Sequence, residues 1–80
     1  MTLEDAKALV TSLYDRAISE AVSFEQIGAE VQKLDKLTAK DLSETAKHFG
    51  VVPGKKKQDT LDAILEKISR RKATHARTQF

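Results

Sequence analysis

The stretch that decides the fold runs from residue 37 to residue 71 and reads LTAKDLSETAKHFGVVPGKKKQDTLDAILEKISRR. Thr38 with Asp41 three residues later is a helix N-cap signal, and Gly50 suits the left-handed position that ends a helix. Pro53 and Gly54 then break the chain before three consecutive lysines. The stretch predicts two helices, the second from about residue 58 to about residue 72. The loop between them is apolar at its start and basic at its end.

Apolar residues recur at helical spacing on both sides of this loop. The first helix is expected to turn Leu42, Ala46 and Phe49 inward. The second is expected to bury Leu61, Ile64, Leu65 and Ile68.

Two more helices are predicted upstream. Thr2 is an N-cap followed by acids in the first turn, where the helix dipole favours them. The helix that it opens spans residues 3–21, with an apolar face wide enough for more than one neighbour. Ser23 and Gln26 form a capping box that starts the next helix. Its inward stripe comprises Phe24, Ile27, Val31 and Leu34, while Gly28 beside the stripe indicates either close helix packing or an accidental surface glycine.

The expected fold is therefore all-α, a four-helix small domain. Residues 1–36 form an N-terminal helical hairpin that serves as a scaffold or for oligomerisation. Residues 37–72 form the helix–extended loop–helix module, and residues 73–80 form a basic flexible tail.

Length and composition exclude several classes of protein. Eighty residues, 40% apolar and 32% charged, fit one soluble helical domain rather than a disordered chain. The absence of cysteine excludes disulfides and thiolate metal sites. No apolar run approaches the roughly 20 residues that span a bilayer, and no secretion signal opens the chain. A cytoplasmic protein, nucleoid-associated in a bacterium, is expected, with no membrane partner.

The charge is distributed unevenly along the chain. Residues 1–44 carry nine acids and five bases, a net −4, while residues 45–80 carry three acids and nine bases, a net +6. This asymmetry indicates either a polyanion facing the C-terminal half or a merely solvated surface.

A phosphate site is predicted at the end of the loop. Lys55, Lys56 and Lys57 lie just before a helix N-terminus, whose unpaired N–H groups and dipole both favour an anion. Gly54 has no side chain to keep a phosphate off the backbone. Lysine acts as a point charge and does not read base edges, so salt-sensitive binding with little sequence preference is expected.

Five further cations could widen this site. They are Lys47 in the first helix of the module, with Lys67, Arg70, Arg71 and Lys72 in the second. The alternative for the cluster at residues 70–72 is complementation of the negative end of its own helix dipole.

The module resembles the helix–extended loop–helix family, which includes SAP domains and the N-terminal domain of the Rho transcription termination factor. The matching features are Leu37-Thr38, Asp41-Leu42, Phe49-Gly50-Val51, Pro53-Gly54 with its lysines, Lys57-Gln58-Asp59, and Leu61 with Ala63-Ile64-Leu65 and Ile68. The resemblance covers less than half of the chain. It implies a small module that binds nucleic acid or tethers chromatin, commonly as part of a larger assembly. By that resemblance the contacts are Gly54, Lys55, Lys56, Lys57 and Gln58.

Other chemistry is not expected. Stacking on single strands needs exposed aromatics, whereas Phe24 and Phe49 fall at core positions, Tyr14 lies on an apolar side and Phe80 is terminal. His48 and His75 are far apart without partners at metal-ligand spacing, and no nucleophile–base set is present. The sequence predicts no enzyme, no cofactor and no bound metal.

Two functions from different classes remain open. The first is a nucleic-acid-binding module, with DNA expected ahead of RNA. The second is a protein-interaction or inhibitor protein that docks a partner through the face of its first helix. The long apolar stripe of that helix also favours a homodimer or a partner protein held by the first two helices, against a self-contained monomer.

Overall fold

The computed structural model describes the backbone of residues 1–78 and the side chains of residues 1–75. Within these residues the protein is all-α, with four α-helices and no strand, as predicted. The helices are α1 (Leu3–Arg16), α2 (Phe24–Gln32), α3 (Ala39–His48) and α4 (Lys57–Thr78), and a short 3-10 helix, η1 (Lys33–Lys36), extends α2.

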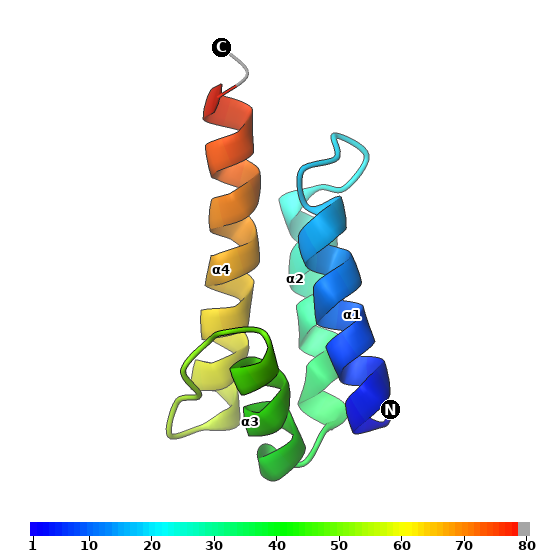
Figure 1. Cartoon of the computed structure of the whole chain (residues 1–80), viewed down its shortest axis with the longest axis vertical. Coiled ribbons are helices and arrows are strands. Elements are labelled where there is room, and N and C mark those ends of the chain that lie inside the picture. Colours follow the sequence, from blue (N-terminus) through cyan, green and yellow to red (C-terminus); the bar gives the residue numbers. More distant parts are fainter. Residues whose placement is uncertain (79–80) are drawn as a thin grey trace.

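The two outer helices, α1 and α4, run in the same direction (Figure 1). α2 runs the opposite way and packs against α4, while α3 covers one end of the bundle and contacts both α1 and α4. α1 and α4 contact each other only sparsely.

The predicted helix starts are confirmed. The hydroxyl of Thr2 accepts a hydrogen bond from the backbone N–H three residues ahead at 3.2 Å, and Thr38 does the same for Asp41 at 3.2 Å. Ser23 and Gln26 bond reciprocally, at 2.9 Å and 3.2 Å, as a capping box. These signals depend on residues three apart, which is why the sequence alone locates them.

The end of α3 is also as predicted. Gly50 has φ of +81°, the left-handed conformation that side chains disfavour. The Gly50 N–H donates to the Lys47 carbonyl at 3.0 Å, and the Val51 N–H donates to the Ala46 carbonyl at 2.8 Å. This pair of bonds is a Schellman motif, which satisfies the last carbonyls of the helix.

All four helices and η1 contribute to one core. Its members, each at most 3% exposed, are Ala6, Val10, Leu13, Ala17, Ile27, Val31, Leu34, Leu37, Leu42, Ala46, Leu61, Ile64 and Ile68. Leu9, Tyr14, Phe49 and Leu65 pack against it from the edge. The apolar face of α1 that suggested a homodimer is thus largely covered within one chain.

The prediction that the first helix reaches residue 21 is wrong, because α1 ends at Arg16. The chain then reverses through turns in which the Ser19 N–H donates to the Arg16 carbonyl at 2.9 Å and the Val22 N–H to the Ser19 carbonyl at 3.2 Å. The Ser19 hydroxyl accepts from the Ala21 N–H at 3.2 Å. Such local side-chain bonds compete with helical ones and favour a turn.

The last helix is longer than predicted. α4 has 22 residues and continues through Thr78 instead of ending near Lys72, so residues 73–78 belong to it. No glycine or proline follows Gly54, and alanine and arginine are good helix formers. Residues 79–80 of the expected tail, with Phe80, lie outside the described residues.

In α2 one residue is not buried as the sequence predicts, and for a second residue the structure decides between two alternatives. Phe24, predicted to be in the core, is 52% exposed. It is the first residue of α2, and α1 ends too early to cover its ring. Gly28 has no atom within 4 Å of the position that a Cβ would take, so its alternative as an accidental surface glycine holds.

Candidate nucleic-acid interface

Thr60, near the start of α4, forms hydrogen bonds to the loop between α3 and α4. This side chain is buried, and its hydroxyl accepts a hydrogen bond from the Gly54 N–H at 3.0 Å. The same hydroxyl donates to the Lys56 carbonyl at 3.3 Å, which also accepts the Thr60 N–H at 3.1 Å. The end of the loop is therefore held in one position relative to the helix that follows.

Gly54 is explained by packing of the chain on itself. A Cβ at this position would lie 2.4 Å from the Cβ of Asp59 in the first turn of α4, closer than real Cβ atoms approach. The sequence suggested that this glycine leaves room for a phosphate. In the structure the Asp59 side chain takes the space that a Cβ would need, so packing of the loop on α4 is sufficient to explain the glycine.

The three loop lysines differ in their surroundings. Lys55 and Lys56 are exposed, and the ammonium group of neither forms a hydrogen bond or ion pair with any described residue. Lys57 is half-buried, and its Nζ donates to the Asp35 carbonyl at 2.7 Å, with an Asp35 carboxylate oxygen at 3.9 Å. Gln58 donates its side-chain amide to Asp62 at 2.9 Å. Of the predicted contacts in this segment, only Lys55 and Lys56 are unengaged.

The first turn of α4 lies directly beside these two lysines. Lys56 provides the first carbonyl of the α4 hydrogen-bond ladder, so the N–H groups of Lys57, Gln58 and Asp59 precede the first helical bond. Such groups point out of the helix end and favour an anion. Asp59 in the same turn offsets part of the lysine charge.

Lys47 lies at the other end of the loop. It is exposed in the last turn of α3, where the loop begins, whereas Lys55 and Lys56 lie where the loop enters α4 (Figure 1). Its neighbour His48 is exposed as well. The loop therefore separates Lys47 from the other predicted contacts.

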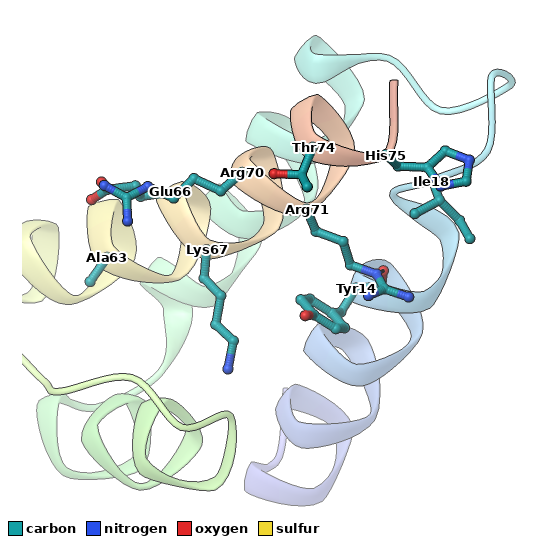
Figure 2. A pocket seen from close by; sticks show the side chains of 9 residues that line it. All are labelled: Tyr14, Ile18, Ala63, Glu66, Lys67, Arg70, Arg71, Thr74 and His75. Carbon is teal, nitrogen blue, oxygen red and sulfur yellow. Dashed lines mark hydrogen bonds and ion pairs between the residues drawn. The ribbon is translucent and has the colours of Figure 1, made fainter. Parts of the chain in front are cut away.

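Arg70 and Arg71 are not brought to the loop. They lie 13 and 14 residues along α4 from Lys57, about 20 Å by helical rise. Arg70 pairs with Glu66 at 2.5 Å on an exposed surface. Arg71 reaches α1, as Figure 2 shows, where its Nε donates to the Tyr14 carbonyl at 3.1 Å and its guanidinium lies 4.3 Å from the Tyr14 ring centroid.

Lys67 and Lys72 likewise have partners within the bundle. Lys67 Nζ donates to the Phe49 carbonyl at the end of α3, at 2.6 Å. Lys72 Nζ donates to the carbonyls of Ser19 at 3.1 Å and Ala17 at 3.4 Å, just past the end of α1. Cations of α4 therefore complement the negative ends of α3 and α1. The alternative derived from the sequence was that these cations complement the dipole of α4 itself. The local sequence pattern could not reveal partners that lie 18 to 55 residues away.

This reduces the set of cations available to a ligand. Of the nine bases in residues 45–80, five are engaged inside the structure, and Arg77 lies beyond the described side chains. Within residues 45–75, the bases whose side chains have no partner are Lys47, Lys55 and Lys56.

Two lysines outside the predicted set lie at the same end of the molecule as the start of α4. Lys36 ends η1, next to the Asp35 that holds Lys57, and Lys40 lies in the first turn of α3. Both are exposed and unpaired among the described residues (Figure 1 shows the junction). The signal for them was present, because both flank the predicted helix start at Leu37-Thr38.

Two features are absent from the part of the chain that the structure describes. No group of three or more histidine, aspartate and glutamate side chains gathers there in an arrangement that could hold a metal ion. None of its helices combines the length and apolar character that a bilayer crossing requires. Comparison with known protein families, with curated proteins and with solved structures finds no match.

Proposed function

We propose that this protein binds the backbone of nucleic acid, DNA ahead of RNA, through Lys55, Lys56 and the first turn of α4. Lys36 and Lys40 extend the contact at the same end of the molecule. The binding is non-catalytic and discriminates little between sequences. The observation that supports this most is that Lys55 and Lys56 are exposed and unpaired beside outward-pointing N–H groups.

Several interactions would act together on a phosphate bound at this end of α4. A phosphate beside Lys55 and Lys56 receives two positive charges, together with hydrogen bonds from N–H groups that have no helical acceptor. The hydrogen bond that the Gly54 N–H donates to the Thr60 hydroxyl fixes the loop in advance, which reduces the entropy lost on binding. Each neutralised phosphate releases counterions, so affinity falls steeply as salt rises.

The proposal retains the resemblance to SAP and Rho N-terminal modules for residues 37–71, with a narrower set of contacts. Gly54 and Gln58 are support residues in this account, and Arg70 and Arg71 lie outside the interface. We further propose that the protein is cytoplasmic, nucleoid-associated in a bacterium, and acts as one module of a DNA-associated process such as transcription.

Fluorescence anisotropy with labelled duplex DNA, single-stranded DNA and RNA tests the proposal, at about 50 mM and about 200 mM salt. The matched pair of variants is Lys55→Gln/Lys56→Gln and Lys7→Gln/Lys33→Gln. The control pair removes the same charge from lysines of α1 and η1, each of which pairs with a glutamate three residues before it, at 3.8 Å and 3.0 Å.

We expect binding at low salt that the loop variant loses and the control variant retains. No binding of any of the three ligands at low salt would refute the proposal. Equal loss of binding in both variants would show that binding depends on the net charge of the protein and not on the loop lysines.

A further inference from the structure

A groove of about 610 Å³ opens between α1 and α4, two helices that contact each other only sparsely. Figure 2 shows its two walls, with Tyr14 and Ile18 from the α1 side and residues of α4 from Ala63 to His75 opposite. It lies along the middle of α4, away from the loop that enters this helix. The proposed nucleic-acid interface therefore does not use it.

The groove combines an apolar surface with cations. Tyr14 packs against the core from its edge, Ile18 is 36% exposed and Ala63 is half-buried. Lys67, Arg70 and Arg71 line the same groove, with Glu66 as the one acid among its lining residues. An occupant that matches both features is apolar on one side and acidic at its margins.

Arg71 is held in a defined orientation. Its Nε is bonded to the Tyr14 carbonyl at 3.1 Å, and its guanidinium lies over the Tyr14 ring at 4.3 Å. These contacts use one N–H and one face of the guanidinium, so the two Nη groups retain donors. A guanidinium fork fixed in this way matches a carboxylate in bidentate geometry.

We propose that this groove docks an acidic amphipathic helix of a partner protein. The α4 wall spans residues 63–75, about 18 Å of helix, which corresponds to roughly three turns of a docked helix. Its apolar side chains would cover Tyr14, Ile18 and Ala63, and its carboxylates would meet the Nη groups of Arg71 and the exposed guanidinium of Arg70. Helix-in-groove docking places anchors at this spacing.

Two competing occupants fit less well. The helices in the acidic half of this chain bury their apolar stripes, which comprise Ala6, Val10, Leu13, Ile27 and Val31, so a second copy has no free amphipathic helix of this kind to offer. A nucleic-acid backbone has no apolar side for Tyr14 and Ile18, and Glu66 repels it.

The groove contains its own spectroscopic reporter. Tyr14 is the only tyrosine and the chain has no tryptophan, so tyrosine emission reports on this site alone. The probe is a synthetic peptide of about three helical turns, with leucine at helical spacing, glutamate elsewhere and no aromatic residue. Its two controls replace all glutamates by glutamine, or all leucines by alanine.

Two variants of the protein test the two walls, and a third serves as control. Ile18→Glu adds a repelling charge at an exposed turn position, and Arg70→Glu reverses an exposed charge. Lys33→Glu is matched to Arg70→Glu, because Lys33 also pairs with an acid one turn away, at 3.0 Å, but lies outside the groove. Far-UV circular dichroism verifies that each variant folds.

We expect the glutamate–leucine peptide to change Tyr14 emission saturably, and both control peptides to bind at least about tenfold more weakly. Ile18→Glu and Arg70→Glu should each weaken binding about tenfold, while Lys33→Glu stays within about twofold. Lys55→Gln/Lys56→Gln should bind the peptide normally, which separates this proposal from the nucleic-acid one.

Several results would overturn the docking proposal. They are an unchanged Tyr14 signal, equal binding of the glutamine peptide, or groove variants that bind like Lys33→Glu. Displacement of the peptide by duplex DNA would assign the groove to nucleic acid. Sedimentation as a dimer that Ile18→Glu dissociates would assign it to a second copy.

Discussion

Replacement of Lys67 by methionine tests whether cations of α4 stabilise the ends of its neighbours. The Lys67 Nζ donates to the Phe49 carbonyl at 2.6 Å, past the last turn of α3, and lies 4.6 Å from the Phe49 ring centroid. Methionine keeps most of the alkyl length, which packs beside these rings, and removes both the donor and the charge. The change therefore isolates the polar part of the interaction.

The expected loss follows from these contacts. A hydrogen bond from a charged donor contributes about 1.5–3 kcal/mol, and an ammonium over an aromatic ring about 0.5–1 kcal/mol. Both depend on one half-buried ammonium, so they are not independent, and water can replace part of the lost bond. We expect Lys67→Met to lower the free energy of unfolding by about 2 kcal/mol, which corresponds to a fall in Tm of about 10 °C in a domain of this size.

Urea and thermal unfolding followed by circular dichroism at 222 nm measures this effect, with Lys47→Met as the matched control. Lys47 is a lysine in the last turn of α3 whose ammonium group has no bonded partner among the described residues, so its loss should change stability by no more than about 0.5 kcal/mol. Equal stability of Lys67→Met and Lys47→Met would refute the claim that α4 cations cap the neighbouring helices.

Three further substitutions test the packing of the backbone, each by the same unfolding measurements. Gly28→Ala should raise stability by about 0.5–1 kcal/mol, because the added Cβ meets no atom and the helix gains propensity; a loss would contradict the open site. Gly54→Ala should lower it by about 2 kcal/mol, because the Cβ would lie 2.4 Å from that of Asp59; a neutral result would reopen a ligand role for this glycine. Thr60→Val should lower stability by about 1–2 kcal/mol by leaving the Gly54 N–H unpaired, and an unchanged value would show that the loop is not fastened there.

Helix starts and the core were predictable from sequence because their determinants are local. Thr2, Ser23 and Thr38 cap helices through bonds to residues three positions ahead, and Gly50 ends α3 through its own conformation. The inward stripe of α4 is periodic, and its Leu61, Ile64 and Ile68 are all buried. No partner from a distant segment is needed for any of these.

The partners of the basic residues were not predictable in the same way. The carbonyl of Tyr14 bonds to Arg71, which is 57 residues away, and those past the end of α1 bond to Lys72. The charge of residues 45–80, taken from the sequence alone, treats all of their bases as equally available to a ligand. Only the tertiary structure separates the cations that stabilise helix ends from Lys55 and Lys56.

We propose that phosphates of the nucleic acid contact Lys55 and Lys56, and not the arginines of α4. The salt dependence of duplex binding tests it directly, because the slope of log affinity against log salt counts neutralised phosphates. We predict that Lys55→Gln/Lys56→Gln reduces the magnitude of this slope by about two, whereas Arg70→Gln leaves it unchanged. A slope that is unaltered in the loop variant, or reduced in Arg70→Gln, would contradict the account.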